Sequence, residues 1–156
     1  MATPRRARGV YVWTAALWCC LVAPAVAVDV NPPLPTGTIV IGDRVTVTVE
    51  LARSLGEKVR GLSGRPGLKP GTGMLFVYDR SQPIGIWMKD MRFALDILWI
   101  REGRVVHIEW NAPPLTAVGP ERVYTATGDM VLEVPAGFAT DRKIKVGHSV
   151  KADIPQ

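Results

Sequence analysis

Cysteine and histidine are scarce in this chain of 156 residues, which contains two of each. Both cysteines, Cys19 and Cys20, lie in the first 27 residues, so the remainder holds no thiol and cannot form a disulfide. The histidines, His107 and His148, are far apart in the sequence and form no His-x-x-x-His pair. The sequence therefore gives little support to thiol catalysis or to a zinc site, and we predict no cofactor.

The longest apolar run of the chain lies near its N-terminus. Three arginines at positions 5, 6 and 8 precede the mostly apolar stretch 10–23, and Ala25-Val26-Ala27 places small residues where a signal peptidase cleaves. We therefore predict a signal peptide over residues 1–27 and a periplasmic or secreted protein. The alternative is an uncleaved anchor helix, because the apolar stretch extends to about Val28 and nearly reaches the length of a membrane span.

The chain outside residues 1–27 carries little net positive charge. The three arginines are the only charged residues of 1–27, so removing the segment lowers the formal net charge from +5 to +2. A nearly neutral domain lacks the basic surface that is typical of nucleic-acid binding. We expect no nucleic-acid partner, and contact with a membrane only through the N-terminal segment if it stays uncleaved.

The rest of the chain predicts a flexible, proline-rich leader over residues 28–37 and a single domain over 38–156. Strands are predicted at 38–41, 44–51, 74–78, 85–89, 95–100, 104–110, 122–126, 130–134 and 147–154. Turns are expected at 79–83 and 128–129. Ser54 followed by Glu57 forms a capping box and predicts a helix over 55–62, and a second short helix is expected over 136–143. Many short strands with one or two short helices predict a mainly β fold, either a compact β-sandwich or a barrel.

Five short motifs occur in order along the domain. They are Arg60-Gly61-Leu62, Gly73-Met74-Leu75-Phe76, Trp87-Met88-Lys89, Leu95-Asp96-Ile97 and Leu132-Glu133-Val134. Over about residues 45–150 the chain thereby resembles the bacterial and archaeal family called domain of unknown function 192, from which it departs at Ser63, Asp90-Met91 and His148. The resemblance implies a compact, mostly β fold with a jelly-roll-like or barrel sheet and an early helix. It implies no established activity, cofactor or catalytic residue.

Two charged residues lie in the most apolar part of the domain, residues 73–97. Lys89 ends one predicted strand and Asp96 begins the next, and a buried charge is costly unless it is paired. One interpretation is an ion pair between these two side chains that fixes the register of the strands. The other is the polar end of a ligand-binding cleft with Trp87 at its floor.

Further charged residues are candidate parts of a site. Arg60 and Arg65 bracket the glycine-rich turn after the predicted helix, and their guanidinium groups could hold a carboxylate or phosphate. Alternatively they are solvated or pair with Glu57 and Asp79. Glu133, in an otherwise apolar strand, is expected to face the sheet edge in a salt bridge, with acid–base chemistry as the alternative.

The function predicted from these residues is an exported domain that binds a small molecule, a glycan or an envelope component. The predicted ligand-binding residues are Trp87, Lys89, Asp96 and Arg65. The sequence leaves open the identity of the ligand, the oligomeric state and whether the protein catalyses any reaction.

Two other functions stay open at this point. An enzyme acting on an envelope carbohydrate would use Asp96 with Glu133, provided that their carboxylates lie about 5–10 Å apart in a cleft. Alternatively, the thioethers of Met74, Met88 and Met91 could bind Cu(I), although methionine in an apolar strand is usually part of the core.

Overall fold

The structure is a computed structural model, and it describes residues 33–115 and 122–155. The predicted signal peptide and residues 28–32 of the predicted leader lie outside the described residues. None of the helices within the described ranges is long and apolar enough to cross a membrane.

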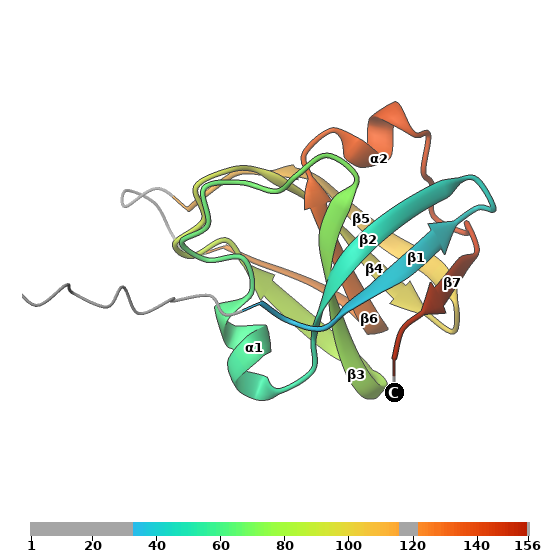
Figure 1. Cartoon of the computed structure of the whole chain (residues 1–156), viewed down its shortest axis with the longest axis horizontal. Coiled ribbons are helices and arrows are strands. Elements are labelled where there is room, and N and C mark those ends of the chain that lie inside the picture. The colour runs from blue at the N-terminus through green and yellow to red at the C-terminus, as the bar shows by residue number, and fades with distance from the viewer. Residues whose placement is uncertain (1–32, 116–121, 156) are drawn as a thin grey trace, which may run out of the picture. The chain divides into compact units, whose positions relative to one another are not determined.

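One sheet of seven strands forms the domain (Figure 1), in the order β5-β4-β6-β3-β2-β1-β7. The strands are β1 (Thr36–Ile41), β2 (Val45–Ala52), β3 (Thr72–Trp87), β4 (Leu95–Arg101), β5 (Arg104–Ala112), β6 (Val123–Pro135) and β7 (Val150–Asp153). Neighbouring strands are antiparallel except for the parallel pair β2 and β3. The predicted mainly β fold is confirmed.

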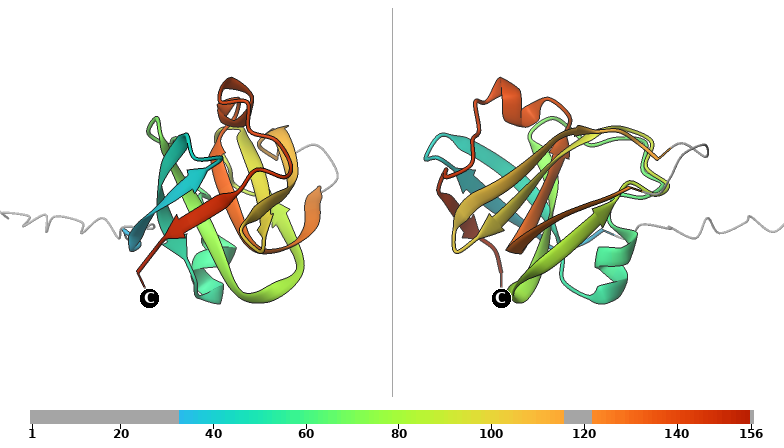
Figure 2. Two further views of the ribbon diagram at one scale, coloured as in Figure 1. Left: turned by 90° about the vertical axis from the view of Figure 1, so that its right-hand side faces the viewer. Right: turned by 180° about the vertical axis from the view of Figure 1, so that it is seen from behind.

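The two outer strands of this order approach each other, so that the sheet curls into a half-barrel (Figure 2). The amide of Val105, in β5, donates a hydrogen bond of 2.9 Å to the carbonyl of His148, and the amide of Val150 donates one of 2.7 Å to that of Gly103. Arg104 and Ser149 form an isolated bridge between these two hydrogen bonds. Curling reduces the unpaired edge that an open sheet would expose.

Strands β3 and β6 are longer than predicted, and both bend. β3 continues through 79–83 with a shift of register between Val77 and Gln82, and β6 continues through 128–129, so neither predicted turn ends a strand. At the bend a Cβ atom on Gly128 would lie 2.6 Å from the carbonyl oxygen of Ile100, so only glycine allows this approach. Beyond the bend, residues 82–87 pair with 123–128 as a two-stranded arm.

The two faces of the sheet carry separate cores. On β6, Leu132 and Val134 belong to the core on one face, together with Leu75, Leu98 and other residues of β1, β2 and β5. Val131 belongs to the core on the other face. We call the first face the inner face and the second the outer face. The arm contributes Ile84 and other residues to the outer core, and the indole nitrogen of Trp99 donates a 3.0 Å hydrogen bond to the carbonyl of Ile84.

Helix α1 (Leu55–Arg60) forms where the capping box predicts it, and α2 (Phe138–Asp141) lies within the second predicted helix. The Ser54 hydroxyl accepts a hydrogen bond of 3.3 Å from the amide of Glu57, whose carboxylate accepts one of 2.8 Å from the amide of Ser54. These bonds satisfy amide groups that have no partner within the helix and lower the pKa of Glu57. Gly61, with a φ of 48°, ends the helix.

Candidate functional site

A cavity of about 210 Å³ lies between α1, the turn that follows it, and the outer face of the sheet. From α1 and the turn it is lined by Leu55, Lys58, Val59, Arg60, Gly61, Leu62 and Ser63. From the sheet, the arm and the loop after β3 it is lined by Phe76, Tyr78, Gly85, Ile86, Trp87, Met91 and Glu133. We call it the Glu133 cavity, because Glu133 is its one acidic residue.

Glu133 lies on the outer face of β6, where side chains of the apolar core surround it. Its neighbours across the sheet are Met74 in β3 and Ile97 in β4, and its residue surface is only 4% exposed. Within residues 33–115 and 122–155, no hydrogen bond or ion pair joins the carboxyl group to another side chain or to the backbone. Glu133 therefore does not form the predicted salt bridge. It does not lie at the sheet edge either, since β6 is between β4 and β3.

Burial decides the protonation of Glu133. Removal from water disfavours the charged form and raises the pKa of Glu133 to about 8, from the ordinary value of 4.5. At neutral pH most molecules therefore carry a neutral carboxylic acid at this position. That group can donate a hydrogen bond, or it can ionise when a cation approaches.

Tyr78 and Lys58 form one side of the cavity. The ammonium nitrogen of Lys58 lies 4.1 Å from the centroid of the Tyr78 ring, a cation–π contact. Burial raises the pKa of Tyr78, and the charge of Glu133 raises it further. Burial lowers the pKa of Lys58, and the charges of Asp79 and Glu57 partly oppose this shift.

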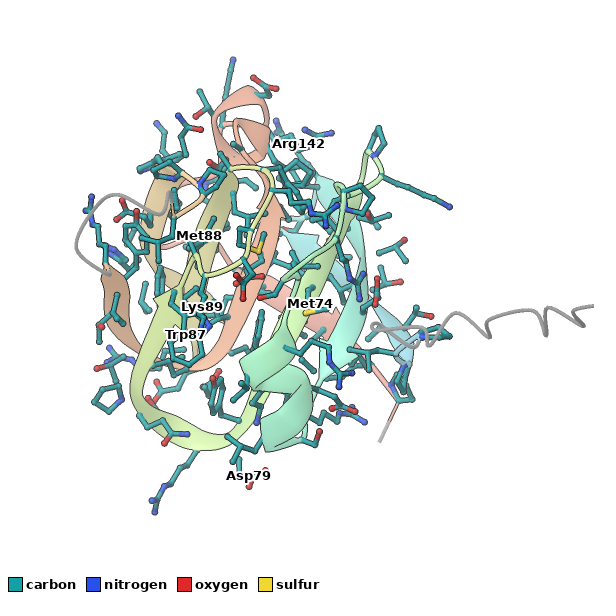
Figure 3. The ribbon with its side chains drawn as sticks, turned by 90° about the vertical axis from the view of Figure 1, so that its left-hand side faces the viewer. Met74, Asp79, Trp87, Met88, Lys89 and Arg142 are labelled. Atoms are coloured by element: carbon teal, nitrogen blue, oxygen red, sulfur yellow. The ribbon has the colours of Figure 1, made fainter. Side chains whose placement is uncertain are left out.

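The mouth of the cavity carries apolar side chains that face solvent. Leu55 and Val59 of α1 are 79% and 51% exposed, and Trp87 at the end of the arm is 43% exposed. Trp87, Met88 and Lys89 lie together at the end of β3 (Figure 3). Exposed apolar residues around a polar, buried floor are typical of a ligand pocket.

Of the four residues predicted to bind a ligand, only Trp87 lines the Glu133 cavity. The Lys89 side chain is exposed, and its backbone carbonyl accepts a 3.0 Å hydrogen bond from the Ser63 hydroxyl. The structure thus separates the four predicted residues into different parts of the domain, and their predicted roles in binding stay predictions.

Asp96 does not pair with Lys89, so the predicted ion pair is wrong. Asp96 is 1% exposed, and its two carboxylate oxygens each accept a hydrogen bond of 2.9 Å, from the amides of Asn111 and Ala139. The two backbone donors satisfy the buried carboxylate in place of a cation, and they connect β4 to the end of β5 and to α2. The role that the structure supports for Asp96 is to hold these elements together.

Arg65 forms a two-pronged ion pair with Glu50, a partner that the sequence did not suggest. The nitrogen–oxygen distances are 2.5 and 2.8 Å. The pair borders a second cavity, of about 280 Å³, between β2 and the segment 65–73. A carboxylate of the protein itself thus occupies the guanidinium face that the sequence suggested for a ligand.

Asp96 and Glu133 do not share a cleft, which removes the predicted pair of catalytic carboxylates. Asp96 is paired in register with Val134, whose side chain lies on the inner face, whereas Glu133 is paired with Ile97, on the outer face. Side chains paired across a sheet lie on the same face, so the two carboxyl groups lie on opposite faces. The two-carboxylate enzyme is therefore rejected.

The three methionines of the Cu(I) hypothesis all belong to the outer core. Met74 and Met88 are 0% and 3% exposed, and of the three only Met91 lines the Glu133 cavity. Copper binding stays a prediction.

The position of Glu133 at the floor of a cavity was not predicted from the sequence. The signal was present, because a single acidic residue interrupts the apolar run 131–134. Its meaning depended on the strands to either side, which come from distant parts of the chain.

Comparison with known proteins identifies the family. The model of the uncharacterized family DUF192 matches residues 38–152. The chain belongs to the DUF192 family. No curated protein sequence matches the chain.

Two solved structures of unestablished function share the fold of this DUF192 protein. One is a Sinorhizobium meliloti protein described as a candidate transcription regulator, with 25% sequence identity and a TM-score of 0.71, where the match covers 78% of this chain and 97% of that one. The other is a protein of unknown function from Novosphingobium aromaticivorans, with 26% identity and a TM-score of 0.67 over 79% and 94% of the two chains. These likenesses support the fold and the family.

Proposed function

We propose that this DUF192 protein is an exported, periplasmic or secreted domain that binds a small ligand in the Glu133 cavity. The observation that carries the proposal is the carboxyl group of Glu133, which is buried, faces the cavity and has no partner within the described residues. A ligand would supply the hydrogen-bonding partner that the protein lacks.

The unpaired, buried carboxyl group of Glu133 lowers the stability of the folded domain. Leaving a polar group without a partner in an apolar environment costs about 1–3 kcal/mol, and more for a charge. A leucine or methionine at position 133 would avoid that cost in a surface made of Val131, Met74 and Ile97. Perturbed ionisable groups in cavities are characteristic of functional sites.

Binding is favoured over hydrolysis of a glycan because the cavity has a single carboxyl group. Glycoside hydrolysis ordinarily uses two carboxyl groups flanking one bond, and Asp96 lies on the other face of the sheet. A sugar remains one class of ligand for such a site, since the exposed ring of Trp87 can stack on an apolar sugar face.

Transcription regulation, named for the S. meliloti relative, does not enter the proposal. The two helices of the described ranges contain six and four residues. A helix that reads the major groove with several side chains is longer than this.

A thermal-shift screen of small metabolites against the purified protein tests the binding proposal. Compounds that raise Tm are expected to act on wild type and on Glu102→Gln, a matched change at an exposed glutamate, but not on Glu133→Leu. Equal stabilisation of Glu133→Leu by every hit would contradict the proposal. Glu133→Gln, which keeps a polar group of the same size, guards against loss of folding in the leucine variant.

Export is tested separately by expressing the full chain in a Gram-negative host and sequencing the N-terminus of the protein recovered from the periplasm. The expected first residue is Val28. Recovery of the intact chain in the cytoplasmic fraction would contradict export without affecting the binding proposal.

A further inference from the structure

The Glu133 cavity has an acidic group at its buried floor and basic groups on its solvent side. The carboxyl group of Glu133 is at the buried floor, whereas the basic groups, Lys58 and Arg60, come from the last turn of α1. The remaining ionisable group of the lining is Tyr78 from β3. Arg60 is exposed and Lys58 is half-buried, so both belong to the solvent side of the cavity.

The basic groups do not neutralise Glu133. Lys58 is held over the ring of Tyr78, and no ion pair joins either basic group to Glu133 among the residues that the structure describes. Burial raises the pKa of Glu133, as expected for a buried carboxyl group that no cation pairs with. The acidic floor and the basic mouth are thus separate electrostatic sites within one cavity.

We infer that the Glu133 cavity binds a small zwitterion, with the ammonium group of the ligand against Glu133 and its anionic group beside Arg60 and Lys58. This inference rests on the proposed function and names the ligand class for that site. Free amino acids and ω-amino acids are the simplest members of the class.

An ammonium group suits the floor because it supplies what Glu133 lacks. It carries three hydrogen-bond donors and a positive charge, and hydrogen bonds between charged partners are about twice as strong as those between neutral ones. The apolar side chains of Phe76, Leu62 and Ile86 line the same space and lower its polarity, which strengthens the attraction between the two charges.

An anionic group suits the mouth because a simple amine would meet two like charges there. The negative charges of Asp79 and Glu57 partly offset the positive charge of Lys58. In the described part of the chain, Arg60 forms no salt bridge with an acidic residue. A carboxylate or phosphate on the ligand can form a two-pronged contact with the Arg60 guanidinium. The exposed Trp87 and Val59 then cover the apolar carbons between the two charged ends.

Binding of this kind releases a proton. Free Glu133 is mostly protonated at pH 7, and it ionises when the ammonium group arrives. The step is R–NH₃⁺ plus the neutral carboxylic acid giving the R–NH₃⁺ carboxylate pair plus H⁺, which passes to the buffer. A neutral ligand that accepts a hydrogen bond from the carboxylic acid would release none.

Isothermal titration calorimetry at pH 7 with linear ω-amino acids from glycine to 6-aminohexanoate tests the inference. One chain length is expected to bind at least about tenfold more tightly than the alkylamine or the alkyl carboxylate of the same length. Repeating the titration in two buffers of different ionisation enthalpy is expected to show release of close to one proton. Glu133→Gln should weaken binding by at least about tenfold and abolish the proton release.

Variants at the mouth separate the two ends of the ligand. Arg60→Gln is expected to weaken binding of the amino acid several-fold but to leave binding of the alkylamine unchanged or tighter. The matched control is Arg101→Gln, at an exposed arginine of β4 that does not line the cavity. This variant should bind the amino acid and the alkylamine as tightly as wild type does. Equal affinity for the amine and the amino acid in wild type would overturn the inference.

The outcomes also separate this inference from the proposed function. If neutral sugars or other uncharged compounds bind in a Glu133-dependent manner while no amino acid does, the zwitterion is wrong and the ligand-binding function stands. If the affinity of every ligand found is the same for wild type and Glu133→Leu, both are wrong.

Discussion

The two buried carboxyl groups of the sheet, Asp96 and Glu133, lie on its opposite faces and differ in their hydrogen-bonding partners. Asp96 is 1% exposed and accepts two backbone hydrogen bonds, from the ends of two other elements. Glu133 is 4% exposed and has no hydrogen-bonding partner within 33–115 and 122–155, yet it borders a cavity. The two residues are almost equally buried, and they differ in the hydrogen-bond donors that surround each carboxyl group.

This difference separates a structural carboxylate from a candidate functional one. Two backbone amides satisfy the oxygens of Asp96, and α2 and the end of β5 depend on it for these hydrogen bonds. The surroundings of Glu133 favour the neutral form and leave its hydrogen bonds to be made by something else. Burial of a charged residue type is therefore a poor guide to function until its partners are known.

The largest effect is expected from removing the satisfied carboxylate. Asp96→Ala leaves the buried amide of Ala139 and the partly buried amide of Asn111 without acceptors, and we expect a loss of about 3–5 kcal/mol in the free energy of unfolding. Urea denaturation of the purified protein measures it. Asp96→Asn, which keeps one acceptor oxygen, should lose less. A loss below about 1 kcal/mol in the alanine variant would mean that Asp96 is not the structural member of the pair.

Glu133→Gln should instead remove a dependence on pH. The pKa of Glu133 is raised to about 8 in the folded state and is near 4.5 in the unfolded chain, so wild type loses stability as pH rises from about 4.5 to about 8. Between pH 5 and pH 8 we expect this loss to be about 3 kcal/mol larger in wild type than in Glu133→Gln. Urea denaturation across this range measures it, with Glu102→Gln as the control. Parallel pH profiles for wild type and Glu133→Gln would show that Glu133 ionises as it does in water.

The smallest effect is expected at the helix that covers the Glu133 cavity. Ser54→Ala removes the hydroxyl that accepts from the amide of Glu57, and we expect a loss of about 1 kcal/mol in the free energy of unfolding. Because α1 supplies Lys58 and Arg60 to the cavity, ligand affinity should fall with stability in this variant. Thermal unfolding with and without ligand measures both. Unchanged affinity would indicate that the position of α1 is set by packing and not by its cap.

Local features of the sequence predicted the elements well. The capping box of Ser54 and Glu57 located α1 because both of its hydrogen bonds join neighbours in the chain. The alternation of residues 45–51 located β2 for the same reason. The predicted turns at 79–83 and 128–129 were wrong, because glycine, proline and polar residues favour a bend within a long strand as much as a turn between two strands.

The candidate site could be predicted only in part. Trp87, expected at the floor of a cleft, lies at the mouth of the Glu133 cavity. Lys89 and Asp96 were expected to meet because their strands follow each other in the chain. Asp96 instead meets backbone amides 15 and 43 residues away. The partner of Arg65 was equally non-local, since Glu50 comes from β2, before α1.

The sequence by itself determined the family, the mainly β composition and the capped helix, because these depend on residue types, on their spacing and on contacts within one turn of chain. Only the tertiary structure decided which carboxyl group was satisfied and which was left facing a cavity. Successive side chains of a strand point to opposite faces, and the groups that surround each face come from strands that pair across the whole length of the domain. The proposed function therefore rests on Glu133, and the binding roles predicted for Lys89 and Asp96 stay predictions.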